Sequence, residues 1–150
     1  MTPLFNKLNL KTRNKIHVLN APPSFEPELA ALRGVAVIRS ATKPVDFALA
    51  FVITNDQRDA ACEQLVKHAQ GDAVLWLCYP KGTSKKYQCE FNRDAGWDVL
   101  GAAGYEPVRM VAIDEDWSAL RFRKAENIKT MTRNPHGAIS TSGKKKASAK

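Results

Sequence analysis

The sequence predicts an α/β domain with three layers around a mostly parallel open sheet, and three observations indicate it. Short apolar runs alternate along the chain with segments whose apolar residues recur at helical spacing. The run 73–79 is continuously apolar, which is typical of a central strand buried on both faces. Two late apolar runs, 108–113 and 119–123, flank a short polar segment and predict an antiparallel hairpin at the end of the sheet.

The first half of the domain is predicted from breaks in the apolar pattern. Residues 16–19 form a strand, which ends at 20–24 because that segment holds two prolines. Ser24 is a favoured N-cap residue, so a helix is expected from there to a point before Gly34. The next two strands are expected at 35–38 and 45–53, separated by Pro44.

The second half continues the alternation. A helix is predicted at 56–70, after cap residues at 54–56 and before Gly71, which stands where a C-terminal cap belongs. The central strand 73–79 leads into a basic, polar loop at 80–88. A short helix at 95–103, capped by Asp94, then precedes the hairpin.

Charge divides the chain into three parts. The net charge of +8 arises from +4 in residues 1–15 and +6 in residues 124–150, whereas the part between them carries −2. We therefore expect a flexible basic lead-in at 1–14, a single domain at 15–124, and a basic, largely disordered tail at 125–150.

Several function classes are disfavoured. The apolar runs are too short to cross a bilayer, and the N-terminus lacks the apolar region of a secretory signal, so no membrane contact is expected. The three cysteines show no CxxC spacing, which predicts reduced thiols in a cytoplasmic protein. The three histidines have no metal-ligand spacing, so no metal site is predicted.

The turn after the first strand lacks the glycine fingerprint of Rossmann-like dinucleotide-binding folds. Its sequence at 20–24 holds two prolines, which have no amide to offer a pyrophosphate, and no glycine. The predicted fold is therefore Rossmann-like without that fingerprint, and neither a cofactor nor a catalytic residue is assigned.

The strongest candidate site is the loop after the central strand, because ligands of open α/β sheets bind beyond the carboxyl ends of strands. A glycine, two hydroxyls and three lysines there suit a phosphate or another anion. The alternative is a solvated basic loop. The candidate residues are Lys81, Gly82, Thr83, Ser84, Lys85 and Lys86, followed by Asn92, Arg93 and Asp94.

A second candidate lies in the hairpin turn, at Asp116, Trp117 and Ser118, where three acids stand side by side at 114–116. Adjacent side chains in a strand or turn point in different directions, so these acids are not expected to converge on one ion. Turn hydrogen bonds and cross-strand ion pairs with nearby arginines explain them equally well.

The tail carries Lys144, Lys145 and Lys146, which suit a weak, salt-sensitive contact with nucleic acid. The alternative is a tail that only improves solubility.

Three stretches of the chain resemble a known family. Residues 79–86, 92–97 and 111–123, and above all the Asp-Trp-Ser-x-x-Arg segment from Asp116 to Arg121, are similar to a family of small bacterial proteins of unknown function. The resemblance implies a bacterial cytoplasmic α/β domain, and it brings no catalytic residue with it.

Together these observations predict an uncharacterised domain that binds a small anionic or nucleotide-like ligand at 80–86. The alternative prediction is a protein- or nucleic-acid-interaction module that uses the basic tail and performs no catalysis.

Overall fold

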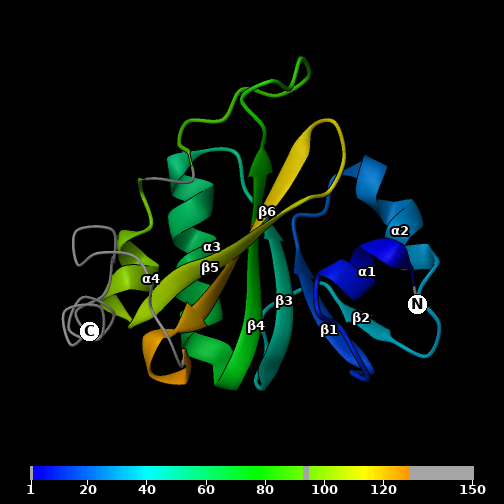
Figure 1. Ribbon diagram of the computed structural model, residues 1–150, viewed down its shortest axis with the longest axis vertical. Coiled ribbons are helices and arrows are strands. Elements are labelled where there is room, and N and C mark those ends of the chain that lie inside the picture. The colour runs from blue at the N-terminus through cyan, green and yellow to red at the C-terminus, as the bar shows by residue number, and fades with distance from the viewer. Residues whose placement is uncertain (1, 93–94, 129–150) are drawn as a thin grey trace.

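The computed structural model describes residues 2–92 and 95–128, and six strands form one sheet in the order β2-β1-β3-β4-β6-β5 (Figure 1). Strands β2, β1, β3 and β4 are parallel to one another, whereas β6 is antiparallel to both β4 and β5. The predicted open, mostly parallel sheet with an antiparallel hairpin is confirmed. The strands are β1 (Lys15–Leu19), β2 (Ala36–Ile38), β3 (Val45–Phe51), β4 (Ala69–Pro80), β5 (Tyr105–Ala112) and β6 (Trp117–Lys124).

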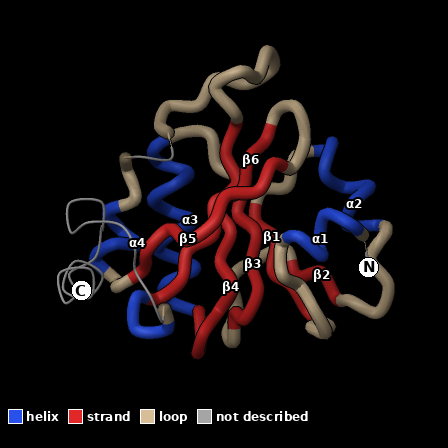
Figure 2. The backbone as a smooth tube through the Cα atoms, viewed as in Figure 1, coloured by secondary structure: helices blue, strands red, loops and turns tan. Residues whose placement is uncertain are grey.

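Helices cover both faces of this sheet and complete the three layers (Figure 2). The long helix α3 and the short α4 pack on one face, and two short helices, α1 and α2, pack on the other. The helices are α1 (Pro3–Lys7), α2 (Glu26–Ala30), α3 (Asn55–His68) and α4 (Asp98–Ala102), with 3-10 turns η1 (Pro23–Phe25) and η2 (Ala125–Asn127).

Strand β3 shows how the sheet separates two cores. Its alternate side chains Phe47, Leu49 and Phe51 face α1 and α2, and we call this side the α1/α2 face. The intervening residues Ala48, Ala50 and Val52 face α3, on what we call the α3/α4 face. Both sets are buried, as the continuous apolar run predicts for a strand inside a sheet.

Helix α3 begins as its sequence predicts. The Thr54 hydroxyl accepts a hydrogen bond from the Gln57 amide at 3.1 Å, and the Gln57 side chain accepts one from the Thr54 amide at 3.2 Å. This reciprocal capping box satisfies amides that have no partner inside the first turn of the helix.

The N-terminal segment corrects the prediction of a flexible lead-in at 1–14. Residues 3–7 form α1, and Phe5, Leu8 and Leu10 are buried on the α1/α2 face. The Trp76 indole donates a hydrogen bond to the Leu8 carbonyl at 2.9 Å, which ties this segment to the central strand. Its apolar residues are too few to show a periodicity, and the sheet supplies the surface that they cover.

Two predicted caps were also wrong. Ser24 caps no helix, because it lies inside η1, whose N-cap residue is Pro22. Gly71 has a left-handed backbone (φ +61°) but lies within β4, which begins at Ala69 directly after α3. Helix α4 begins at Asp98, later than predicted, and Asp94 lies outside the described residues.

In the described part of the chain, no helix combines the length and apolar character needed to cross a bilayer. Of the tail predicted at 125–150, the structure describes residues 125–128, of which 125–127 form η2. The rest of the tail, from residue 129 onward, lies outside the described residues.

Candidate functional site

The candidate site lies at the carboxyl edge of the sheet, where β3 and β4 end and β6 begins. The loop from β4 towards α4 and the β5–β6 turn project from this edge side by side (Figure 1). A main-chain hydrogen bond joins them, in which the Lys81 amide donates to the Asp116 carbonyl at 2.8 Å. The site is thus built on the ends of rigid central strands.

Ser84 holds the loop after β4 in shape. Its hydroxyl donates to the Asp116 carboxylate at 2.7 Å and accepts from the amides of Lys86 and Tyr87 at 3.2 and 3.1 Å. Since one hydroxyl serves three partners, Ser84 is a structural latch between the loop and the hairpin turn.

The acids of the hairpin turn have structural roles. The Asp114 carboxylate accepts from the amides of Asp116 and Trp117 at 2.8 and 2.9 Å, which closes the turn. Asp116 is held by Ser84, and Glu115 is exposed. Among the described residues, no group of three or more acids, histidines or cysteines is placed to hold a metal ion.

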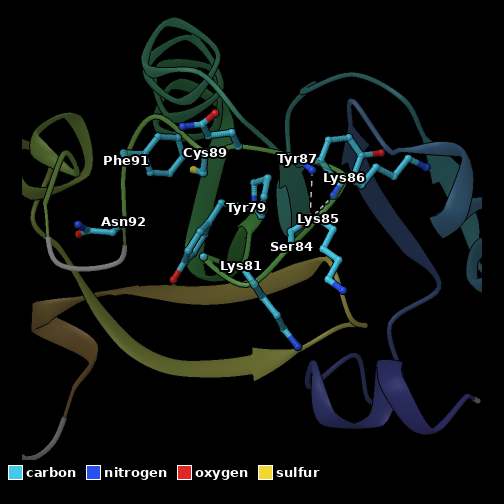
Figure 3. A pocket seen from close by; sticks show the side chains of 12 residues that line it. Tyr79, Lys81, Ser84, Lys85, Lys86, Tyr87, Cys89, Phe91 and Asn92 are labelled. Carbon is cyan, nitrogen blue, oxygen red and sulfur yellow. Dashed lines mark hydrogen bonds between the residues drawn. The ribbon is translucent and has the colours of Figure 1, made fainter.

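A pocket of about 640 Å³ opens under the loop after β4, and we call it the β4 pocket (Figure 3). Tyr79 and Phe91 form an apolar wall, with their rings 5.8 Å apart, and Cys89 lies beside Phe91. Lys81 and Lys85 extend on the opposite side (Figure 3). The lining comprises Tyr79, Pro80, Lys81, Gly82, Ser84, Lys85, Lys86, Tyr87, Gln88, Cys89, Phe91 and Asn92.

Cys89 is the thiol of this pocket, and it is half-buried. Burial raises the pKa of Cys89, and the amide hydrogen bond from Phe91 and the charge of Arg58 offset this only in part. The thiol is therefore protonated at neutral pH and is a poor nucleophile.

The start of α3 borders a second hollow of about 470 Å³ that shares Phe91 and Asn92 with the β4 pocket. Arg58 lies there with its guanidinium 5.0 Å from the centre of the Phe91 ring, and it donates to Asn55 at 2.8 Å. The Glu90 carboxylate accepts from the Asn55 amide at 2.8 Å. These contacts fix the far end of the loop on the first turn of α3.

A topological switch point lies between β1 and β3, because the chain places β2 on one side of β1 and β3 on its other side. Ligands of open α/β sheets bind at such a switch point. Here Asn20, directly after β1, has a left-handed backbone (φ +59°), the conformation that glycine usually provides. The missing glycine therefore does not mean that the turn itself is missing.

Aromatic side chains line the edge from this switch point to β6, and we call them the aromatic row. Phe25 contacts Phe51, Phe51 contacts Trp117, and Trp117 contacts Tyr87, with ring centres 4.8, 5.2 and 5.1 Å apart. The Trp117 indole nitrogen is buried and donates to no acceptor. A buried indole N–H normally has a partner, so this one offers an unused donor.

The predicted site residues fall into three groups. Arg93 and Asp94 lie outside the described residues, and Trp117 and Ser118 are buried in β6. The remaining residues line the β4 pocket or an adjoining hollow of about 450 Å³ above the hairpin turn: Lys81, Gly82, Thr83, Ser84, Lys85, Lys86, Asn92 and Asp116. Their role in binding stays a prediction.

Sequence reasoning missed the apolar half of this site. Tyr79, Tyr87 and Phe91 form walls, and Arg58 approaches from a helix more than twenty residues earlier in the chain. The alternation of Tyr87, Cys89 and Phe91 within a polar loop was the available signal, because exposed loops rarely carry so many apolar residues unless they cover something.

Three solved structures, two of them methyltransferases, share this fold. A SAM-dependent methyltransferase from Aquifex aeolicus is 15% identical, with a TM-score of 0.53 over 80% of this chain and 87% of that one. The N-methyltransferase NodS from Bradyrhizobium japonicum WM9, in complex with S-adenosyl-L-homocysteine, is 12% identical, with a TM-score of 0.51 over 81% and 84%. The fibrillarin pre-rRNA processing protein of Methanococcus jannaschii is 13% identical, with a TM-score of 0.50 over 77% and 68%.

At these identities the likeness establishes the fold. No protein-family model matches the chain, and a search of curated proteins finds no match to it. The resemblance of residues 111–123 to a family of unknown function therefore stays a prediction.

The comparison corrects the predicted function. The sequence predicted an uncharacterised domain that binds a small anionic or nucleotide-like ligand at 80–86, with an interaction module that uses the tail without catalysis as the alternative. Both are wrong as statements of function against these findings, because the similar structures include methyltransferases. A nucleotide-like ligand by itself agrees with the S-adenosyl-L-homocysteine bound in one of those structures. The prediction relied on the lysines of one loop. The switch point depends on the order of the strands in the sheet, and the lysine content of a loop carries no information about that order.

Proposed function

We propose that this chain binds S-adenosylmethionine at the carboxyl edge of its sheet and transfers the methyl group to an acceptor in the β4 pocket. One observation carries the proposal: a pocket of about 640 Å³ opens at the end of β4, one strand from the switch point of a sheet whose fold is shared with a solved methyltransferase. The two positions are adjacent because β3, at the switch point, pairs directly with β4.

The absence of a glycine fingerprint is compatible with this ligand. The fingerprint lets a backbone approach the pyrophosphate of a dinucleotide, and prolines cannot donate amides to phosphate. S-adenosylmethionine has no phosphate group, so the close approach of the backbone to a pyrophosphate, one of the roles of these glycines, is not required. Pro22 and Pro23 thus argue against a dinucleotide while leaving room for a phosphate-free nucleoside.

The residues at the switch point fit a nucleoside in two respects. Asn20 keeps the left-handed turn after β1. In the aromatic row Phe25, Phe51 and Trp117 are buried, so the ring face open to a flat base is that of Tyr87, and the Trp117 indole N–H behind it suits a ring nitrogen as acceptor. Tyr87 is the half-buried member of the row, and its loop covers Trp117.

The bound group supplies an electrophilic methyl carbon on a sulfonium sulfur. The chain's own residues position the acceptor and exclude water. Tyr79 and Phe91 present the apolar wall, and the Ser84–Asp116 hydrogen bond keeps the loop closed over the pocket. Cys89 remains protonated and does not compete as a nucleophile.

Calorimetric and thermal titrations of the full chain with S-adenosylmethionine and S-adenosyl-L-homocysteine test the proposal. A ligand at 100 times its dissociation constant stabilises the folded state by about 2.7 kcal/mol, which raises the unfolding midpoint by several degrees. Trp117→Phe removes the indole donor and keeps a ring, so it should weaken binding.

Trp97→Phe is the matched control, because Trp97 is equally buried but lies on the α3/α4 face. It should leave binding unchanged. The absence of a shift with either ligand at millimolar concentration would refute the proposal. If binding is found, release of S-adenosyl-L-homocysteine with a mixture of small acceptors distinguishes a transferase from a binding domain.

A further inference from the structure

Four arginines gather on the α1/α2 face at the amino end of the sheet, opposite to the candidate site. Arg121 lies across from Arg109 on β5 and across from Trp76 on β4, so Arg109 and Arg121 share the side of the sheet that holds Trp76. Arg123 follows two positions later on the same face. Arg13, just before β1, completes what we call the arginine face.

The acids on this face are already engaged. Arg13 pairs with Asp46 at 2.7 Å, and Arg123 donates to Asp72 at 2.9 Å. Glu106, opposite Arg123, is fully buried. Across residues 2–92 and 95–128, neither Arg109 nor Arg121 forms an ion pair with a neighbouring acid.

Arg121 shows the consequence of this imbalance. It is half-buried, and its Nε atom is buried without a hydrogen-bond acceptor. Desolvation lowers the pKa of Arg121, the positive charges of Arg123, Arg13 and Arg109 lower it further, and Asp72 opposes them only in part. An anion placed on this face would therefore relieve a repulsion that the fold leaves uncompensated.

The positive surface extends beyond the sheet. A shallow hollow of about 290 Å³ adjoins Arg13 and is also lined by Lys11 and Arg33, with no acid in its lining. The surface is thus a row of cations spread over several strands and the N-terminal loop. Such a row suits a long, regularly charged ligand better than a small one.

We propose that the arginine face binds the phosphate backbone of a nucleic acid. Guanidinium groups match phosphate oxygens with paired hydrogen bonds, and backbone phosphates supply charges at regular spacing. A membrane surface fits less well, because Val108 and Met110 are the only exposed large apolar residues in the described part of the chain, and Met110 contacts the Tyr79 hydroxyl and so lies on the other face of β5. The site is at the opposite edge from the β4 pocket, so it is independent of the proposed function.

Fluorescence anisotropy of the full chain with labelled duplex DNA and single-stranded RNA, between 50 and 200 mM salt, tests this proposal. Arg109→Gln/Arg121→Gln should weaken binding by tenfold or more at 100 mM salt. For duplex DNA it should also reduce the slope of log affinity against log salt by about 1.8, since each lost phosphate contact contributes about 0.9. Arg109→Gln alone, at an exposed position, should give a smaller loss without affecting folding.

Lys85→Gln/Lys86→Gln is the matched control, because it removes the same charge from the opposite edge of the sheet. The proposal is overturned if this control weakens binding as much as the arginine variant, which would indicate an effect of net charge alone. It is also overturned if polyglutamate or anionic vesicles bind as tightly as nucleic acid and show the same loss. The proposal is likewise overturned if the arginine variant binds nucleic acid as tightly as the unsubstituted chain.

Discussion

The two faces of the sheet solve the same packing problem with different side chains. On the α3/α4 face, a helix of 14 residues packs over the small residues Ala48 and Ala50. On the α1/α2 face, two helices of five residues each cover Phe47, Leu49 and Phe51. Small side chains let a long helix approach closely, whereas short helices leave space that large rings must fill. On each face, the size of the β3 side chains therefore matches the space that the covering helices leave.

The difference has a consequence for function. The aromatic row belongs to the α1/α2 face, and its first member, Phe25, lies in η1 directly before α2. The arginine face lies on the same side of the sheet, towards the amino ends of the parallel strands. The aromatic row and the arginine face thus share the α1/α2 side of the sheet.

The largest expected effect tests whether the N-terminal segment is part of the α1/α2 core. Phe5→Ala should lower the free energy of unfolding by about 3–5 kcal/mol, because a fully buried ring is lost and a cavity remains. Urea unfolding followed by tryptophan fluorescence measures it, with Lys7→Ala on the exposed side of α1 as the control. A loss below about 1 kcal/mol would restore the prediction of a flexible lead-in.

The next effect tests the close approach of α3. Ala50→Leu inserts a larger side chain beneath that helix and should cost about 1–3 kcal/mol of unfolding free energy through overpacking. Ala60→Leu makes the same substitution on the exposed side of α3 and should be nearly neutral. If both variants have equal stability, the volume match between β3 and α3 does not explain the alanines.

A smaller effect concerns how α3 begins. Thr54→Ala removes the hydroxyl that accepts from the Gln57 amide and should destabilise the fold by about 0.5–2 kcal/mol. Thr54→Ser keeps the hydroxyl and should retain most of the stability in thermal unfolding. Because Asn55 and Arg58 lie in the first turn, the alanine variant should also loosen the loop at Glu90.

The smallest effect is a pH dependence from His17, which is buried on the α3/α4 side beside Thr42. Burial lowers the pKa of His17, and the charge of Lys15 lowers it further. The unfolded chain therefore binds the proton more readily, so stability is full above the ordinary histidine pKa and is lost as the pH falls below it. For one histidine the loss between pH 7.5 and 6 is at most about 0.8 kcal/mol.

Chemical denaturation across that pH range measures the slope, and His17→Gln should flatten it. An unchanged slope in this variant would assign the pH dependence to a group other than His17 and contradict the prediction.

Much of the fold was predictable because local patterns report local structure. The continuous run at 73–79, the cap at Thr54 and the paired runs of the hairpin each carry a signal within a few residues. The burial of Phe5 and Leu10 had no such local signal, since the strands that these residues pack against are distant in the sequence. The polar half of the candidate site was predictable from loop chemistry, whereas its walls were not.

By itself, the sequence determined the kind and order of the elements, because hydrophobic period and capping act over a few residues. Only the tertiary structure decided that β1 and β3 meet at a switch point, that Trp117 keeps an unused donor, and that four arginines share one face. These features depend on which strands pair and in what register. Pairing joins residues far apart in the chain, and no local pattern encodes it.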